Sequence, residues 1–151
     1  QHYDEKPSGS LIYSLYMTGA ATSDTLPLNQ QLAFAQFNVI RKVAQADNCV
    51  IVGRCADYVL REKTNLLTVF LHAPMDYRVD RVMAENSIDS RALAEKTIKK
   101  QDKSRADYYN FFTHKKWGDA GSAMLSIDTS TLPSDQVAEV IAGYAMLMQN
   151  T

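Results

Sequence analysis

Three short apolar runs, which alternate with segments of helical character, restrict the fold of this chain more than any other feature. The runs are "CVIV" at 49–52, "LLTVFLHA" at 66–73 and "AMLSID" at 123–128, and polar residues bound each of them. Continuous apolar runs of this length are typical of strands covered on both faces. Strands that alternate with helices build a parallel sheet with helices packed against it. The sequence therefore predicts an α/β fold around a parallel sheet.

The segment before the first run has the spacing of an amphipathic helix that begins near Leu28. Pro27 suits its start, because the fixed φ angle of proline fits the first turn. Apolar residues then recur at steps of three and four, which places them on one face. We expect this face to be buried, and its residues are Leu32, Ala35, Val39, Ile40 and Val43.

The remaining segments between and after the apolar runs are also predicted to be helical. A short helix is expected within 56–62, and a charged helix begins after Pro74. In a long polar helix over 89–114 the apolar residues are too sparse for a wide core stripe, so we expect it to project from the body. The last helix lies within 132–149. Its expected buried stripe is Val137, Val140, Ile141, Tyr144 and Met148.

Length, charge and cysteine content limit the class of protein. The 151 residues suffice for one domain, 1–151, and the formal net charge of −1 lacks the basic excess of a nonspecific nucleic-acid binder. No window holds the roughly 20 apolar residues of a membrane span, and no basic-then-apolar leader opens the chain. We therefore expect a cytoplasmic protein without nucleic-acid or membrane partners. Cys49 and Cys55 have no metal-ligand spacing and are expected to be reduced.

Cationic residues recur close to the predicted strand ends. Gly53 and Arg54 follow the first run at the end of the strand, where open parallel sheets bind ligands. Arginine offers a planar fork of donors that matches phosphate or carboxylate. Arg78 and Arg81 lie one turn apart in the charged helix, and the long polar helix carries Arg105 among several lysines. If that helix folds back over the strand ends, these charges converge on a cleft for an anion with several phosphates.

Ordinary structural roles remain open for the same cations. Arg78 and Arg81 can pair with Asp76, Asp80 or Glu85, all within the same helix. A lysine-rich helix is usually a solvated face. Spacing alone leaves both the phosphate cleft and the ion pairs as interpretations.

Other polar and aromatic residues are weaker candidates. Asp57 can orient Arg54 or accept hydrogen bonds from a ligand, but it also suits a helix start. Asp128 follows the third run and is more simply a turn residue than a metal ligand. The histidines show no ligand spacing, so no metal site is predicted. The aromatic segment 107–119 can stack a base or anchor the root of the long helix, and we favour the anchor.

Four stretches in this order resemble the cytidylate kinase-like family of P-loop nucleoside monophosphate kinases. They are "CVIVGRCADYVL", "TVFLHAPMDYRVDRV", "KKQDKSRADYYNFFTHKKWGD" and "MLSIDTSTLPSDQV", and the match runs from about Leu28 to the end. The resemblance implies a three-layer fold, in which helices flank the parallel sheet, with a helical lid at 87–116. It also implies ATP and Mg²⁺ as cofactors, and a nucleotide or other phosphorylated small molecule as partner.

The resemblance assigns roles to the arginines outside the lid. Arg54 looks like the arginine near the acceptor phosphate, and Asp57 lies beside it in the substrate-binding sequence. Arg78 and Arg81 are similar to the donor-side arginines that bind the nucleotide.

Within the lid, Arg105 and Asp102 correspond to substrate-binding positions of the family. Phosphoryl transfer is catalysed mainly by positioning and by neutralising charge on the equatorial oxygens. Arg105 and Arg54 are therefore the predicted catalytic residues. Closure of the lid would exclude water, which otherwise competes as acceptor.

The chain departs from the family's pattern at three points. No G-x-x-x-x-G-K-[ST] or looser glycine-rich loop occurs in it, so the backbone cradle for the donor phosphates is missing. Cys55 follows Gly-Arg where authentic cytidylate kinases have aspartate, and the nearest acid is Asp57. Lysines and Gln101 occupy much of the lid segment, which weakens bidentate phosphate contacts.

We therefore expect the C-terminal three quarters, roughly, of a cytidylate kinase-like phosphotransferase, with the true N-terminus upstream of Gln1 and little or no turnover by itself. The alternative is a non-catalytic α/β module that binds an anion or a nucleotide. A structural domain whose arginines make only ion pairs is a third interpretation. The apolar stretch at 11–17 could pack against a second subunit, which leaves a homodimer open.

Overall fold

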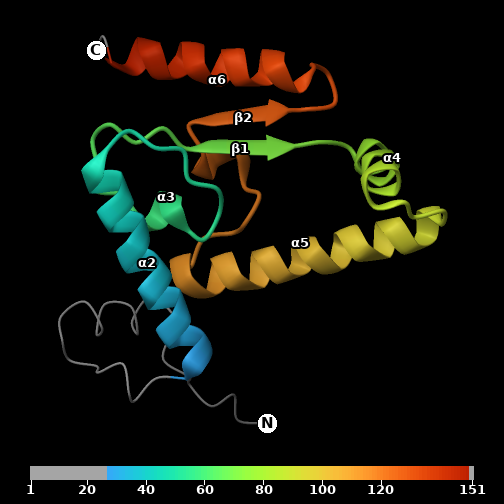
Figure 1. Ribbon diagram of the computed structural model, residues 1–151, viewed down its shortest axis with the longest axis horizontal. Helices are drawn as coiled ribbons and strands as arrows, with labels where there is room; N and C mark the ends of the chain where they lie inside the picture. Colours follow the sequence, from blue (N-terminus) through green and yellow to red (C-terminus); the bar gives the residue numbers. More distant parts are fainter. Residues whose placement is uncertain (1–26, 150–151) are drawn as a thin grey trace. The chain divides into compact units, whose positions relative to one another are not determined.

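The computed structural model describes residues 27–149, and the apolar stretch at 11–17 lies outside them. None of the described helices is both long and apolar enough to cross a membrane. The elements follow one another along the chain as shown in Figure 1. In order, they are α2 (Leu28–Ala46), α3 (Ala56–Val59), β1 (Val69–His72), α4 (Met75–Asn86), α5 (Arg91–Thr113), the 3-10 turn η2 (Ala120–Ser122), β2 (Leu125–Asp128) and α6 (Ser134–Gln149).

The described residues divide into two units. Unit 1 holds residues 27–64 and 107–116, and unit 2 holds residues 65–106 and 117–149. The long helix α5 therefore contributes its first part to unit 2 and its last turns to unit 1. Each unit has its own packing and is described by itself.

An aromatic cluster forms the core of unit 1. Phe34 and Phe37 of α2 are each 1 % exposed, and both meet the ring of Phe112 from the end of α5. The ring centroids lie 6.1 Å and 5.3 Å from that of Phe112, and both pairs meet edge to face, the arrangement that aromatic rings favour. This contact explains why the segment 107–119 is rich in aromatic residues, and it confirms the anchoring role expected for that segment.

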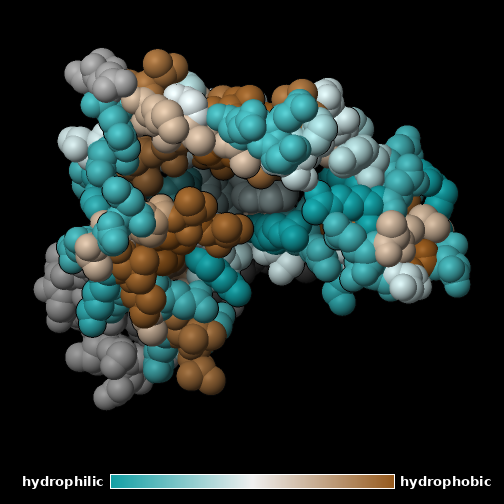
Figure 2. Space-filling view, turned by 45° about the horizontal axis from the view of Figure 1, so that its top comes forward, coloured by the Kyte–Doolittle hydropathy of each residue, from teal (hydrophilic) through white to brown (hydrophobic). Residues whose placement is uncertain are grey.

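The buried face of α2 differs from the expected one. Of the five residues predicted to be buried, only Ile40 is, and Leu32 and Val39 are each 59 % exposed. Apolar residues follow helical spacing on two sides of α2, and the side with the phenylalanines packs because rings offer the larger surface to Phe112. The aliphatic side is left on the surface, and Figure 2 shows that hydrophobic residues are exposed on the face in view.

The strand predicted at 49–52 is not formed. This segment carries no strand assignment, and Val50 and Val52 are 95 % and 89 % exposed. A strand is defined by its hydrogen-bonded neighbours, and within residues 27–149 no strand pairs with this one. The mixed α/β class is confirmed, whereas the three-layer arrangement around a wide sheet is not seen.

Two of the predicted strands are confirmed in unit 2, where they form a two-stranded parallel sheet. β1 and β2 pair in the register Val69↔Leu125 through His72↔Asp128, so both strands end at the same edge. Each strand is shorter than its apolar run. The N–H of Leu125 donates to the carbonyl of Thr68 at 3.1 Å and extends the pairing by one bond.

The helices of unit 2 begin and end close to their predicted limits. Val79 of α4 packs against Ala94 and Ile98 of α5, and these three residues form the core cluster of the unit. Helix α6 lies beside β2 in Figure 1. It buries Val137 but leaves Val140 45 % exposed, because a two-stranded sheet offers it less surface than the wide sheet expected. The other members of its predicted stripe are half-buried, namely Ile141, Tyr144 and Met148.

Candidate anion-binding site

Arg54 lies in a turn whose backbone is left-handed at three consecutive residues. The φ angles are 70° at Gly53, 55° at Arg54 and 56° at Cys55. Each non-glycine residue in this conformation costs on the order of 1 kcal/mol. The turn closes when the N–H of Ala56 donates to the carbonyl of Gly53 at 3.1 Å, and α3 begins there. Strain of this kind persists where the surrounding structure holds a residue in place, which makes Arg54 a candidate functional residue.

The guanidinium of Arg54 lies over an aromatic ring. Its central carbon is 5.7 Å from the centroid of the Tyr108 ring, which is within the range of a cation–π contact. The Tyr108 hydroxyl is buried beside this guanidinium. Burial raises the pKa of Tyr108, and the charge of Arg54 opposes that rise. A cationic group and a buried hydroxyl therefore lie together, a pairing that suits an oxygen-rich anion.

Asp57 is held by a tyrosine and not by Arg54. The hydroxyl of Tyr109 donates to Asp57 Oδ2 at 2.6 Å, and burial together with this bond raises the pKa of Tyr109. The nearby Cys55 thiol is 3 % exposed, and its pKa is raised to about 12, chiefly by burial and then by the charge of Asp57. A thiol of this kind stays protonated near neutral pH, so Cys55 is not a nucleophile.

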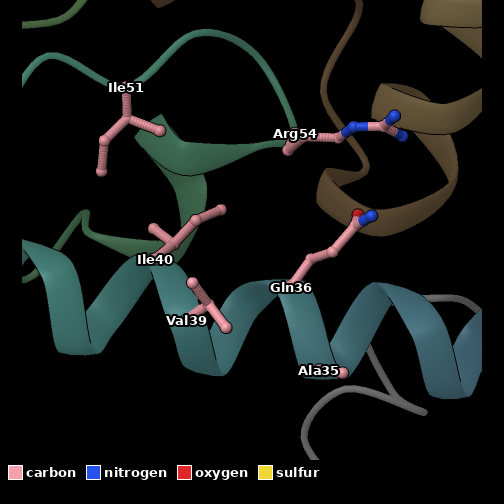
Figure 3. Close-up of a pocket in the computed structure, with 6 residues that line it drawn as sticks. All are labelled: Ala35, Gln36, Val39, Ile40, Ile51 and Arg54. Atoms are coloured by element: carbon pink, nitrogen blue, oxygen red, sulfur yellow. The ribbon is translucent and has the colours of Figure 1, made fainter.

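A shallow pocket adjoins the turn. Its volume is about 360 Å³, and its lining is apolar apart from Gln36 and Arg54. Figure 3 shows the Arg54 side chain extending away from Ile40 and Ile51, so the guanidinium lies off the apolar part of the pocket. The lining residues are Ala35, Gln36, Val39, Ile40, Ile51 and Arg54. Apolar walls do not solvate phosphate, so the pocket itself suits an apolar group.

In unit 2, one carboxylate joins two of the predicted arginines. Nη2 of Arg78 lies 2.7 Å from Oδ2 and 2.8 Å from Oδ1 of Asp102, and Nη1 of Arg105 lies 3.0 Å from the same Oδ1. The side chain of Asp102 is 20 % exposed, so its carboxylate is partly shielded from water, whereas the side chain of Arg105 is 56 % exposed. A guanidinium has five N–H donors, and Asp102 is the one acceptor seen for Arg105 within residues 27–149. Arg105 therefore keeps donors that can reach an anion.

The ion pairs of α4 agree in part with the interpretation that its arginines pair with acids of the same helix. Arg81 pairs with Glu85 at 2.7 Å, one of the pairings that the sequence allowed. Asp76 and Asp80, the other acids offered to the α4 arginines, both contact Arg91 of α5. Arg78 instead pairs with Asp102 of α5. A pairing between residues four apart can be predicted from spacing, whereas the contacts of Arg78 and Arg91 depend on how the two helices pack.

The structure distributes the predicted site residues over the two units. Arg54 and Asp57 belong to unit 1, where Tyr108 and Tyr109 join them. The remaining predicted residues belong to unit 2, which brings three of them together and leaves Arg81 with Glu85. The sequence offered the aromatic segment 107–119 as a surface for stacking a base, with the anchoring role favoured, and singled out neither tyrosine as a site residue. Their only signal was that two adjacent aromatic residues follow the arginine-bearing stretch "SRAD".

The described acids do not form a metal site. Within residues 27–149, no group of three or more histidine, cysteine, aspartate or glutamate side chains could hold a metal ion. Asp128 accepts hydrogen bonds from the backbone N–H of Ser130 at 2.9 Å and from its hydroxyl at 2.7 Å, and these bonds lower the pKa of Asp128. Asp128 is therefore a turn residue, as expected. Mg²⁺ in nucleotide enzymes is commonly held by one or two carboxylates and by substrate phosphates, and the carboxylate of Asp102 is already engaged.

Two of three comparisons with known proteins found a match for the chain, and the search of curated proteins found none. A crystal structure of an uncharacterized protein from Eubacterium ventriosum is similar, with 33 % sequence identity and a TM-score of 0.73, and the match covers 82 % of this chain and 69 % of that chain. The model of the cytidylate kinase-like family matches residues 1–131. The chain therefore belongs to the cytidylate kinase-like family.

Proposed function

We propose that the protein acts in phosphoryl transfer from a nucleoside triphosphate to a nucleoside monophosphate or a similar phosphorylated acceptor. The observation that carries this proposal is the strained turn that presents Arg54, in a chain of the cytidylate kinase-like family. An arginine held over the Tyr108 ring loses little further entropy when an anion binds, because its side chain is already ordered.

The other arginines would act on the transferring and donor phosphates. Arg105 belongs to the lid segment 87–116, and its unused donors can reach the equatorial oxygens, whose charge must be neutralised during transfer. Arg78 and Arg81 would bind the donor nucleotide. Arg78 is fixed by Asp102, which makes it the better ordered of the two.

Asp57 and Asp102 would each contribute to substrate binding, in their own units. Asp57 is fixed by Tyr109, so it can accept a hydrogen bond from a ligand without first being ordered. Asp102 would hold the guanidinium of Arg105 for the acceptor. ATP with Mg²⁺ would supply the transferable phosphoryl group and part of the neutralising charge. Because the sequence contains no glycine-rich phosphate loop, we expect the 151-residue chain alone to show little turnover.

Anion binding tests the proposal directly. We expect pyrophosphate, ATP and CMP, each with and without Mg²⁺, to raise the melting temperature of the protein, because a ligand of the folded state stabilises it by mass action. The variant Arg54→Gln should lose at least part of that shift. Arg61→Gln is the matched control, since Arg61 is an exposed arginine of the same unit that contacts the ring of Tyr58 and Glu62. Equal shifts in all three proteins, or no shift at all, would contradict the proposal.

A non-catalytic module that binds a nucleotide or another anion is the second candidate. The strained turn and the Arg54 guanidinium can bind an anion without any transfer of phosphate. The two candidates differ in turnover, because both bind the anion but one transfers phosphate. Mg²⁺-dependent production of ADP from ATP and CMP, lost in Arg54→Gln, supports the enzyme, whereas binding without ADP production supports the module.

A further inference from the structure

The outer face of α2 carries a stripe of exposed aliphatic side chains. Leu28 is 80 % exposed, Leu32 and Val39 are 59 % exposed, and Val43 is 45 % exposed. Their steps of four, seven and four residues place them on one side of the helix. Ala35 and Gln36 lie at the middle of this stripe and are uncharged. Contiguous apolar surfaces of this kind usually mark a contact with another molecule.

The opposite side of α2 is already packed. Phe34 and Phe37 are buried against Phe112, so α2 has apolar surfaces on two sides. A helix that is apolar on opposite sides normally lies between two packing layers. Only one of these layers is present among residues 27–149 of a single chain.

The spacing of the stripe is symmetric about its own midpoint. Leu32 and Val39 lie equally far from the point between Ala35 and Gln36, and so do Leu28 and Val43. We propose that a second copy of the chain covers the stripe, with the two α2 helices packed antiparallel across a two-fold axis at this point. A two-fold interface must be self-complementary, and this spacing meets that condition.

In this arrangement each leucine meets a smaller valine. Leu32 packs against the partner's Val39, and Leu28 packs against the partner's Val43. Ala35 at the centre has a small side chain, which lets the two helices approach closely. Pairs of a large and a small apolar side chain interdigitate better than two large ones do.

The charge beside the stripe favours the antiparallel orientation. Lys42 flanks the stripe, whereas Arg41, the other charged residue of α2, lies on the side of the phenylalanines. A parallel pair would hold the two Lys42 side chains at the same level, and the antiparallel pair separates them along the helix axis. Like charges that lie close together are destabilising, so the charge of Lys42 favours the antiparallel pair.

The pocket beside α2 supplies an anchor point for the partner. Val39, Ile40 and Ile51 line it, and Figure 3 shows these three side chains gathered between α2 and the 49–52 segment. Its volume of about 360 Å³ can admit the partner's Leu32, which lies opposite Val39. Val50 and Val52 flank Ile51 and are 95 % and 89 % exposed, so they widen the apolar surface. Side chains that fill such pockets contribute most of the binding energy of an interface.

The mass of the full chain in solution tests this interface. We expect sedimentation analysis at tens of micromolar to give twice the 16.9 kDa of one chain, with dissociation on dilution. Leu32→Asp should give the mass of a monomer while its far-ultraviolet circular dichroism stays unchanged. Leu93→Asp should remain dimeric, because Leu93 is a 53 % exposed leucine on α5 in unit 2.

The contrary results are equally definite. A monomer at every concentration would show that the stripe is covered by other parts of the chain or stays open, and the interface would be wrong. A dimer that survives Leu32→Asp would place the contact elsewhere. Phosphoryl transfer is decided separately, by the anion-binding and ADP measurements, so a failure of the interface and a failure of the proposed function can be told apart.

Cysteine pairs test the orientation without adding charge. In a Cys49→Ser background, the double variant Leu32→Cys/Val39→Cys should form disulfide-linked dimers on mild oxidation, because these positions face each other across the axis. Leu32→Cys alone and Leu28→Cys/Leu32→Cys should link several-fold less. Efficient linkage by Leu32→Cys alone would indicate a parallel pair and overturn the antiparallel one.

Discussion

Tyr109 donates a 2.6 Å hydrogen bond to Asp57 Oδ2, although 52 residues separate them in the chain. The bond joins the last turns of α5 to the first turn of α3, directly after the strained Arg54 turn. It fixes the helix that the turn leads into. We therefore regard Tyr109 as a support for the geometry of Arg54.

Removal of the Tyr109 hydroxyl should destabilise the protein. In Tyr109→Phe the half-buried carboxylate of Asp57 loses its donor, and hydrogen bonds to charged groups contribute about 1.5–3 kcal/mol. We expect the free energy of unfolding in urea to fall by about that amount. Tyr144→Phe is the control, because within residues 27–149 the Tyr144 hydroxyl makes no hydrogen bond, and its loss should change the free energy by less than about 0.5 kcal/mol. Equal losses in the two variants would show that the Asp57 bond has no special weight.

Stability should fall at alkaline pH because of Cys55. Burial raises the pKa of this thiol from 9.0 to about 12, so the unfolded chain releases the proton at a lower pH than the folded protein does. The stabilising effect is fully present below pH 9 and decreases as pH rises from 9 to 12. One such group contributes a slope of about −1.4 kcal/mol per pH unit.

The variant Cys55→Ala isolates this effect. Urea unfolding under reducing conditions at pH 8, 9 and 10 should show a shallower decline for Cys55→Ala than for the unmodified protein. Above pH 10 the tyrosines 108 and 109, whose pKa values are also raised, add to the decline in both proteins. Identical slopes between pH 9 and 10 would refute the buried thiol as the cause.

The left-handed turn should reverse the usual order of two substitutions. In most positions alanine stabilises a protein more than glycine does, because glycine has more freedom in the unfolded chain. At Arg54, with φ at 55°, alanine keeps the strain and glycine relieves it. We expect Arg54→Gly to be more stable than Arg54→Ala by about 1 kcal/mol in chemical denaturation. The opposite order would mean that the turn relaxes when the arginine is removed.

The carboxylate of Asp102, which two arginines of unit 2 share, should contribute measurably to the stability of the protein. Asp102→Asn removes the charge that Arg78 and Arg105 share, in a site that is only 20 % exposed at the aspartate. We expect a loss of about 1–2 kcal/mol in the free energy of unfolding. Asp89→Asn, at an exposed aspartate just before α5, should cost less than about 0.5 kcal/mol. If both variants lose the same small amount, the network contributes no more than an ordinary surface pair.

The sequence predicted the elements whose signals are local. Pro27 and Pro74 do precede helices, and the runs at 66–73 and 123–128 contain β1 and β2. The prediction of a strand at 49–52 was wrong because a strand depends on a partner as well as on its own residues. The predicted buried face of α2 was wrong because two apolar sides of the helix have the same period. Only contact with Phe112 selects between them.

The sequence predicted which cationic residues belong to the candidate site, but it did not predict how they are arranged. Arg54 was singled out as a strand-end residue, whereas it lies in a left-handed turn that only Gly53 could have signalled. The contact between Arg78 and Asp102 spans 24 residues and depends on the packing of α4 against α5. Residue types and spacing define which groups are available, and tertiary contacts decide which of them meet.

The route of the chain through the two units has a consequence for how the protein can be divided. The chain leaves unit 1 after Thr64, returns with residues 107–116, and leaves again at Trp117. A truncation at Thr64 would therefore remove Phe112 from the rings of Phe34 and Phe37, and no single proteolytic cut releases either unit whole. In limited proteolysis and refolding experiments, we therefore expect the two units to unfold and refold together.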